Sequence, residues 1–230
     1  MLNSELGISV KIFNKQLWHL ISLILLLSGI QFVLKYSPLE GYFWGISAKT
    51  WLYYSIGIAI LHQVFVLIIW RLELYYSLIS RIFGKAGFTI YAVGFSIMFI
   101  FRLLFIIALG ISNKNSISLD PVISYSLAIL ILIIVIYLMY SVLKYFGFKR
   151  AYGIDHFDRS FNDMPFVKQG IFRFSNNAMY KFGLLVLWIP GLLLFSKLAL
   201  VAALFQHIYI WVHYYFTEAP DMKHIYGKSK

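Results

Sequence analysis

The 230-residue chain contains no cysteine. This absence excludes disulfide bonds, thiolate metal sites and a cysteine nucleophile. Charged residues are also scarce, at 13% of the chain, whereas 61% of the residues are hydrophobic and the mean hydropathy is +0.79. Because so few polar residues cannot cover a water-soluble globule, we predict that most of the chain is surrounded by lipid.

Acidic residues are the scarcest charged class, with 9 Asp and Glu against 20 Lys and Arg, which gives a formal net charge of +11. Such a charge can indicate a nucleic-acid partner, but its meaning depends on where the cations lie. Here they flank apolar stretches, so we interpret the charge as a topology signal and as attraction to anionic lipid headgroups. We therefore expect a lipid bilayer as partner and no nucleic acid.

Four apolar stretches approach the roughly 20 residues that a spanning helix needs. They cover residues 17–34, 51–70, 88–111 and 122–146. Asp120 and Pro121 precede the fourth stretch as a plausible N-cap and first-turn proline. We expect four transmembrane helices at these positions.

The fifth apolar stretch, residues 182–216, is too long for one ordinary crossing. Pro190 and Gly191 could kink it, and residues 195–197 could form a turn, which predicts a helical hairpin with Lys197 near its tip. One long, kinked helix is the alternative. The predicted fold is an all-α membrane protein with about four transmembrane helices followed by a C-terminal helical hairpin. We divide it into residues 1–146 and residues 147–230.

The cations predict the orientation. If the polar segments alternate between two sides, fifteen of the 20 Lys and Arg residues share the side of the N-terminus, the loop near residues 71–85, the long loop 144–181 and the tail. The other side receives only Lys35, Lys49, Lys114 and Lys197. By the positive-inside rule the first side is cytoplasmic. We expect a multi-pass integral membrane protein with its long loop and tail on the cytoplasmic face.

The hairpin would bring residues 170–183, which read GIFRFSNNAMYKFG, close to residues 213–221, which read HYYFTEAPD. Here the chain resembles the integral-membrane methyltransferases that include phosphatidylethanolamine N-methyltransferases and isoprenylcysteine carboxyl methyltransferases. The resemblance rests on Gly170, Phe172, Asn176-Asn177-Ala178, Tyr180, an apolar hairpin, Glu218-Ala219-Pro220 and Tyr226-Gly227. Asn-Asn-Ala stands where the family usually has Arg-His-Pro, and Ala219 where it usually has a second Glu.

The resemblance implies that S-adenosylmethionine meets a membrane lipid substrate at an active site on the cytoplasmic face. We assign His156, in the polar loop, and Glu218 as catalytic candidates that could accept the proton of the substrate amine; a lipid phosphate or water could accept it instead. The resemblance implies these cofactor-binding residues: Gly170, Asn176, Asn177, Tyr180, Gly183, His213 and Glu218. A carboxylate complements a sulfonium and can accept hydrogen bonds from ribose hydroxyls. No GxGxxG motif follows a predicted strand, which weighs against a Rossmann-type methyltransferase.

Each of these assignments has a structural alternative. Glu218 could be a solvated residue at a helix end, and Asn176 and Asn177 could cap the helix that starts near Ala178. The chain has no HxxxH or HExxH motif, so we expect no metal and interpret His213 as a pocket or interfacial residue. Because Pro220 disfavours helix at the preceding residue, we expect the last helix to end near Ala219, with Asp221 on a solvated tail.

Arg102 lies inside the third apolar stretch, where a charge is costly and usually has a partner. It could bind a lipid phosphate of the substrate, or it could snorkel or form a structural pair. Tyr214 belongs to an aromatic run that is typical of an interfacial belt and could also hold a methylated ammonium. We assign Arg102 and Tyr214 as substrate-binding candidates.

The function that these observations predict is methylation of a membrane lipid amine, phosphatidylethanolamine first. One alternative is a different acceptor on the same scaffold, such as a prenylcysteine carboxylate, a thiol or another amine. A non-catalytic membrane protein is the other alternative.

Overall fold

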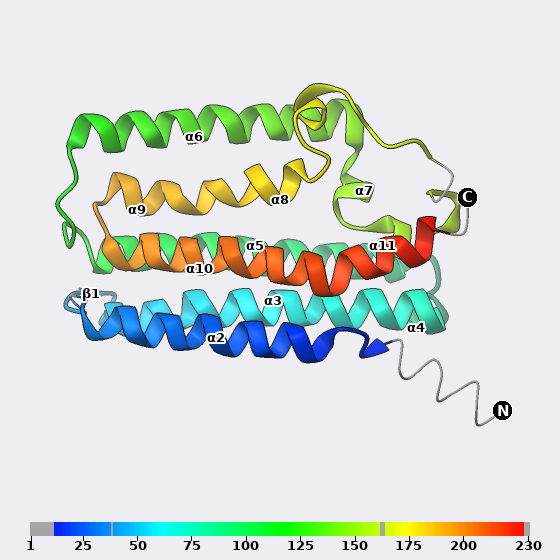
Figure 1. Ribbon diagram of the computed structural model, residues 1–230, viewed down its shortest axis with the longest axis horizontal. Coiled ribbons are helices and arrows are strands. Elements are labelled where there is room, and N and C mark those ends of the chain that lie inside the picture. Colours follow the sequence, from blue (N-terminus) through cyan, green and yellow to red (C-terminus); the bar gives the residue numbers. More distant parts are fainter. Residues whose placement is uncertain (1–11, 38, 162–163, 228–230) are drawn as a thin grey trace.

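The computed structural model describes residues 12–37, 39–161 and 164–227. Nearly all of this is helix, arranged as long rods that run side by side (Figure 1). The first half consists of α2 (Gln16–Lys35), α3 (Ala48–Tyr76), α4 (Leu78–Phe83), η1 (Gly84–Ala86), α5 (Gly87–Ser112) and α6 (Pro121–Ser141), which η2 (Val142–Phe146) continues as a π-turn. Two short strands, β1 (Tyr42–Phe43) and β2 (Ile46–Ser47), form an antiparallel hairpin between α2 and α3.

The second half begins with short helical turns and ends in two long limbs. The turns are α7 (Phe148–Ala151), η3 (Ile154–His156), η4 (Arg159–Phe161) and η5 (Gly170–Arg173). The limbs are formed by α8 (Ala178–Phe182), η6 (Gly183–Trp188), α9 (Ile189–Leu193), α10 (Lys197–His213), η7 (Tyr214–Glu218) and α11 (Ala219–Tyr226).

Five helical stretches of the described chain are long and apolar enough to cross a bilayer: Gln16–Lys35, Ala48–Tyr76, Leu78–Ser112, Pro121–Phe146 and Lys197–Tyr226. The predicted all-α membrane fold is therefore confirmed. The predicted cap of the fourth helix is also present, because the Asp120 side chain accepts a hydrogen bond from the Ile123 N–H at 2.9 Å and Pro121 opens the first turn.

The C-terminal hairpin is confirmed, and the alternative of one kinked helix is wrong. The turn lies at Phe195, which has a φ of 51°, and Ser196 caps α10 by accepting from the Ala199 N–H. The first limb, Ala178–Leu193, is short. Its 3₁₀ stretch η6 rises about 2.0 Å per residue rather than 1.5 Å, which extends the limb to roughly 27 Å, close to the thickness of the hydrocarbon core.

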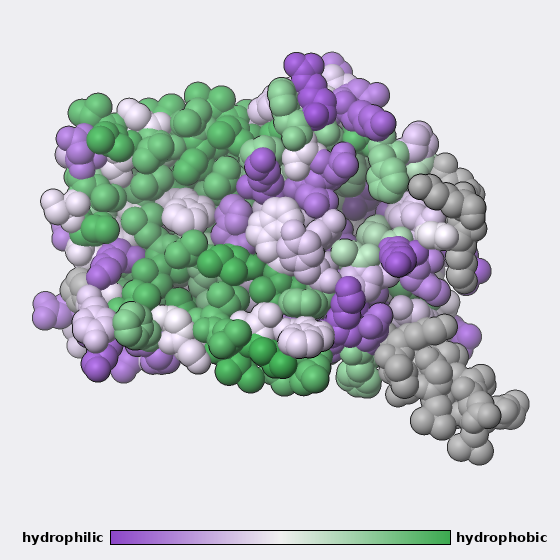
Figure 2. Space-filling view, viewed as in Figure 1, coloured by the Kyte–Doolittle hydropathy of each residue, from purple (hydrophilic) through white to green (hydrophobic). Residues whose placement is uncertain are grey.

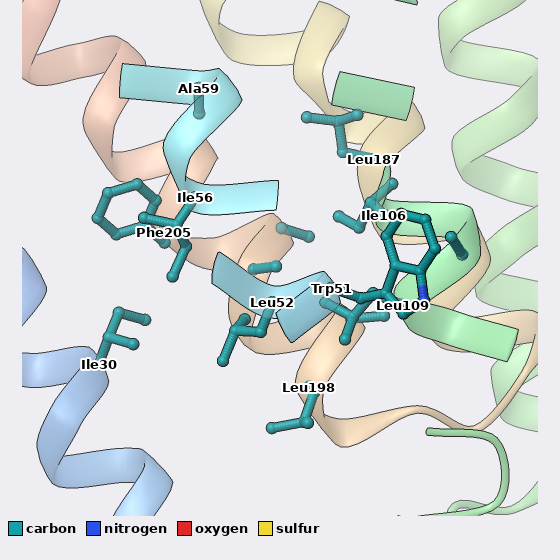
Figure 3. Close-up of a cluster of buried hydrophobic side chains, with 14 of the residues drawn as sticks. Ile30, Trp51, Leu52, Ile56, Ala59, Ile106, Leu109, Leu187, Leu198 and Phe205 are labelled. Carbon is teal, nitrogen blue, oxygen red and sulfur yellow. The ribbon is translucent and has the colours of Figure 1, made fainter. Parts of the chain in front are cut away.

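The main core joins α2, α3, α5, η6 and α10 (Figure 3). Small residues on α10, namely Ala199, Ala202 and Ala203, are fully buried, which lets its backbone approach its neighbours closely. A second cluster packs α6 against η5 and α8, with Leu138 and Phe172 buried between them. Apolar residues cover the middle of the bundle, and hydrophilic residues gather at the end that holds residues 147–177 and α11 (Figure 2).

α4 and the turns that follow α6 lie at this same end, which we call the α11 end. The β-hairpin and the turn after α9 lie at the opposite end (Figure 1). Lys197 of that opposite end donates to the Tyr36 carbonyl at 3.0 Å. Among the described residues, the partition that the cations predicted is thus present in space, with one correction; Lys11, Lys228 and Lys230 lie outside these residues. Arg71 is not a loop residue, because α3 continues to Tyr76 and the Arg71 side chain is fully buried.

Candidate active site

The site begins at the junction of α10 and α11, where the helix does not end at Ala219 as expected. A π-turn, η7, precedes Pro220, and the Ala219 N–H bonds the Tyr214 carbonyl. In a regular α-helix the Phe216 carbonyl would need the N–H that Pro220 lacks. It is instead satisfied by Gln16 Nε2 at 2.9 Å and Arg71 Nη2 at 3.2 Å. The proline therefore redirects the helix without terminating it, because side chains from α2 and α3 replace the missing donor.

Arg71 also holds the N-terminal segment and α11 together. Its Nη1 donates to the carbonyls of Ile12 and Asn14, and its Nε lies 3.3 Å from the Asp221 carboxylate. Asp221 is fully buried, so its expected place on a solvated tail is wrong. Pro220 predicts a helix end by local rules, whereas α11 continues and turns Asp221 inward.

His156 lies in η3, directly beside this ion pair. Its ring stacks on the indole of Trp70 with centroids 4.1 Å apart, and its Nε2 is 3.8 Å from the Asp221 carboxylate. Gly153 makes this stacking possible. Its φ is +79°, and a Cβ at that position would meet Trp70 Cε2 at 2.7 Å. A glycine is therefore needed both for the left-handed backbone and for the close approach of the indole.

Several polar atoms around Trp70 are buried without a hydrogen-bond partner. They are Trp70 Nε1, Tyr91 Oη, Asp155 Oδ1, His156 Nε2 and both ring nitrogens of His213. Trp70 lies between the two histidines, since its ring centroid is 5.9 Å from that of His213. Buried polar groups are normally paired, and each unpaired one costs about 1–3 kcal/mol. A concentration of such atoms in one place indicates a site built for a polar ligand.

The charges of this site are mainly negative. Glu218, the last residue of η7, is half-buried and lies close enough to Asp155 and Asp221 for their charges to repel its own. Glu218 is also close enough to Tyr91, whose hydroxyl faces Trp70, to act on it electrostatically. Within the described residues the only ion pairs involve Asp221. Glu218 and Asp155 are thus carboxylates without a cationic partner, an arrangement that favours a positively charged ligand.

The buried face of α10 extends the polar site into the bundle. Tyr209 lies one turn before His213, and its hydroxyl is 3.1 Å from His19 Nε2. The ring of His19 meets that of His213 edge-on at 6.0 Å. His213, predicted as a cofactor contact, is therefore fully enclosed between α2, α3 and the rest of the site, which excludes an interfacial position.

The other predicted site residues lie in several separate places. Tyr180 and Tyr214 contact each other, with ring centroids 5.1 Å apart, and this pair joins α8 to η7. Gly170 instead packs against α6, where a Cβ would meet Ser141 Cβ at 2.9 Å and where its φ is +59°. Gly183 also faces α6 at Leu138. These two glycines therefore have packing roles at α6.

Asn176 is exposed and Asn177 is half-buried at the start of α8. Asn177 occupies the N-cap position, but its side chain makes no capping hydrogen bond. The capping alternative therefore lacks its defining contact, which leaves the amide free to serve a ligand. Arg102 lies apart, deep between α3, α5 and α10, with its Nε donating to Gln206 at 2.8 Å.

Sequence reasoning did not identify Arg71, Trp70, Tyr91, Asp155 or Asp221. One signal was available for Arg71: it lies within an apolar helix, and an intramembrane charge usually has a partner. Asp155 is adjacent to the predicted His156, so its place in the same polar loop could have suggested it. Nothing in the sequence indicates which tryptophan receives the His156 ring.

Residues 123–229 match the family model described as Phospholipid methyltransferase. The resemblance drawn from the residues is therefore confirmed, and this segment, which runs from α6 to α11, is similar to that family of membrane methyltransferases. It contains His156, His213, Glu218 and Asp221, whereas Trp70 and the other α3 and α5 contributors lie outside it. No curated protein and no solved structure matches the chain.

Proposed function

We propose that the protein transfers a methyl group from S-adenosylmethionine to the amine of a phosphatidylethanolamine-type lipid, on the cytoplasmic side of a membrane. The family match supports a membrane phospholipid methyltransferase. The observation that carries the choice of donor is the set of carboxylates at Glu218, Asp155 and Asp221, which has one arginine partner and surrounds unpaired polar atoms.

The residues fit such a donor. Glu218 can accept hydrogen bonds from ribose hydroxyls or the amino group, and its negative charge complements a sulfonium. The unpaired nitrogens of His213 and the Tyr91 hydroxyl can satisfy further polar groups of the ligand. Asn177 can donate to or accept from an adenine edge or a carboxylate. Arg71 is paired with Asp221. It therefore does not neutralise the negative charges of Glu218 and Asp155, which remain available to the ligand.

S-adenosylmethionine supplies a methyl group on a positively charged sulfur, which leaves as a neutral thioether when the methyl carbon bonds to the amine nitrogen. The protein's own task is to align the two reactants and to exclude water. The lipid ammonium must also lose a proton before its nitrogen can attack. Glu218 and His156 are the groups that we assign to receive it, because Glu218 is a carboxylate at the site and the buried Nε2 of His156 has no hydrogen-bond partner among the described residues.

The test is an incubation of the purified protein with methyl-labelled S-adenosylmethionine and vesicles that contain one candidate acceptor at a time. Phosphatidylethanolamine should be labelled, and phosphatidylcholine, which has no free amine, should not. Label on a prenylcysteine substrate with none on phosphatidylethanolamine would replace the proposed acceptor. Absence of label on every acceptor, together with absence of cofactor binding, would favour a non-catalytic membrane protein.

A further inference from the structure

The middle of the bundle holds a buried cation without a counter-charge. Arg102 on α5 is fully enclosed, and within the described residues no carboxylate lies within ion-pair distance of it. Its Nε donates to Gln206 Oε1 on α10 at 2.8 Å, and its Nη1 lies 3.4 Å from His62 Nδ1 on α3. Neutral partners satisfy part of the guanidinium's hydrogen bonding, but they leave its charge uncompensated in an apolar surrounding.

The hydrogen-bond pattern leaves donors available at this place. An arginine can only donate, so His62 Nδ1 must accept, and the proton of a neutral His62 then lies on Nε2. His62 Nε2, Arg102 Nη2 and the Ser55 hydroxyl are all buried without partners. The Gln206 amide nitrogen donates to the Ser55 carbonyl at 3.2 Å, so it does not serve as a partner for these three groups. The cluster therefore presents a positive charge and unpaired donors and lacks an anionic acceptor.

A structural role alone does not explain this arrangement. An arginine that serves only to join helices is expected to have a carboxylate or backbone carbonyls around it, as Arg71 has at the end of α3. Arg102 has neither, although a charge at this depth costs several kcal/mol without compensation. An anion that is supplied by a ligand would satisfy the guanidinium and the two neighbouring donors together.

We propose that Arg102, His62 and Gln206 form a binding site for the phosphodiester of the lipid acceptor, between α3, α5 and α10. This proposal rests on the proposed function for the identity of the lipid. A phosphodiester shares one negative charge between two oxygens, which suits the two-pronged guanidinium of Arg102. Seating it requires these helices to move apart, because the donor atoms are closed to solvent.

The position relative to the active site agrees with this assignment. Gln206, Tyr209 and His213 occupy successive turns of the buried face of α10, and Gln206 and His213 are about 10 Å apart along the axis. A lipid held at Arg102 by its phosphate would direct its amine along α10 toward Tyr209 and His213. The site would therefore require an acceptor that carries both an amine and a phosphodiester.

The test compares the wild type with a double variant, Arg102→Met with Gln206→Leu. The first change removes the charge, and the second removes the Gln206 amide oxygen, which would otherwise lose its donor. Thermal unfolding of the purified full chain is measured in detergent with dihexanoyl phosphatidylethanolamine, inorganic phosphate, oleate or hexadecylamine, without cofactor. We expect phosphatidylethanolamine to raise the unfolding temperature of the wild type by about 3 °C or more and to have no effect on the double variant. Ser124→Ala, which removes a buried hydroxyl on α6, is the control and should respond as the wild type does.

The sign of the stability change separates a ligand site from a structural pair. Without lipid, the double variant should unfold at or above the wild-type temperature, because an uncompensated buried charge is gone. A lower temperature with an unchanged lipid response would overturn the proposal. An equal response to phosphate or to oleate would overturn the phosphodiester assignment. If the double variant does not fold, Arg102→Lys decides by the same comparison, since it keeps the charge but should weaken the lipid response.

Methyl transfer provides a second measurement that is separate from binding. The double variant should transfer methyl to phosphatidylethanolamine about 10-fold more slowly or worse, while any transfer to hexadecylamine, which has no phosphate, stays at the wild-type rate. Equal losses with both acceptors would contradict the site. If the wild type transfers no methyl at all but the lipid-induced stabilisation still depends on Arg102, the proposed function fails and the phosphodiester site stands.

Discussion

Replacement of Arg71 by methionine should be among the most destabilising single changes at the α11 end of the bundle. The side chain is fully buried and contacts Asp221, the Phe216 carbonyl and two carbonyls of the N-terminal segment. Its loss leaves the Asp221 carboxylate buried beside only His156, and removal of one partner from a buried ion pair costs about 3–5 kcal/mol. For a chain of this size that corresponds to roughly 6–20 °C in unfolding temperature.

Thermal unfolding in detergent measures this loss, with Arg81→Met as the matched control because Arg81 is an exposed arginine on α4 at the same end. Asp221→Asn should also destabilise the protein, and the double variant Arg71→Met with Asp221→Leu should lose less than the sum of the two single changes. If Arg71→Met costs no more than Arg81→Met, Arg71 does not hold this end of the bundle together, and the explanation given for the π-turn at Pro220 is wrong.

Three further predictions concern the site and its orientation. Asn177→Ala should weaken S-adenosylmethionine binding about 5- to 10-fold in a calorimetric titration. It should leave the unfolding temperature unchanged, since the Asn177 side chain makes no capping bond. A lower unfolding temperature at constant affinity would show that Asn177 serves as a helix cap instead. Gly153→Ala should destabilise the protein by about 1–3 kcal/mol more than Gly147→Ala, because both glycines have a positive φ but only Gly153 lies against Trp70; equal costs would show that the contact is unimportant. A membrane-impermeant thiol reagent applied to intact cells should label a cysteine at Lys114 and not one at Ser160, and the reverse result would invert the topology.

The features that follow from local composition could be predicted from the sequence. The length of an apolar run and the residues at its ends define a spanning helix, which is why Asp120 and Pro121 mark the start of α6 correctly. The hairpin was predictable because 35 apolar residues exceed one crossing and Ser196 supplies a cap beyond the turn. These signals depend on a few neighbouring residues, and no distant contact overrides them.

The site could be predicted only in part, because long-range contacts decide it. Pro220 is a helix terminator by local rules, yet Gln16 and Arg71, which lie far away in the sequence, satisfy the carbonyl that it frees. The helix then continues and carries Asp221 from the expected solvent position into the interior. Trp70, on which His156 stacks, and Arg71, which pairs with Asp221, come from α3, outside the segment that carries the family motif. Sequence motifs therefore identified residues of the site without the surroundings that give them their chemistry.

The proposed function depends on the carboxylate of Glu218 holding a cationic methyl donor. It is tested most directly by calorimetric titration of S-adenosylmethionine into the purified wild type, Glu218→Gln and Asp158→Asn. Asp158 is an exposed carboxylate in the neighbouring loop, so it controls for general electrostatic attraction. Glu218→Gln should raise the Kd by about 10-fold or more, which corresponds to loss of a charge-assisted hydrogen bond worth about 1.5–3 kcal/mol, while Asp158→Asn should bind as the wild type does. Unchanged affinity in Glu218→Gln, or an equal loss in Asp158→Asn, would contradict the account.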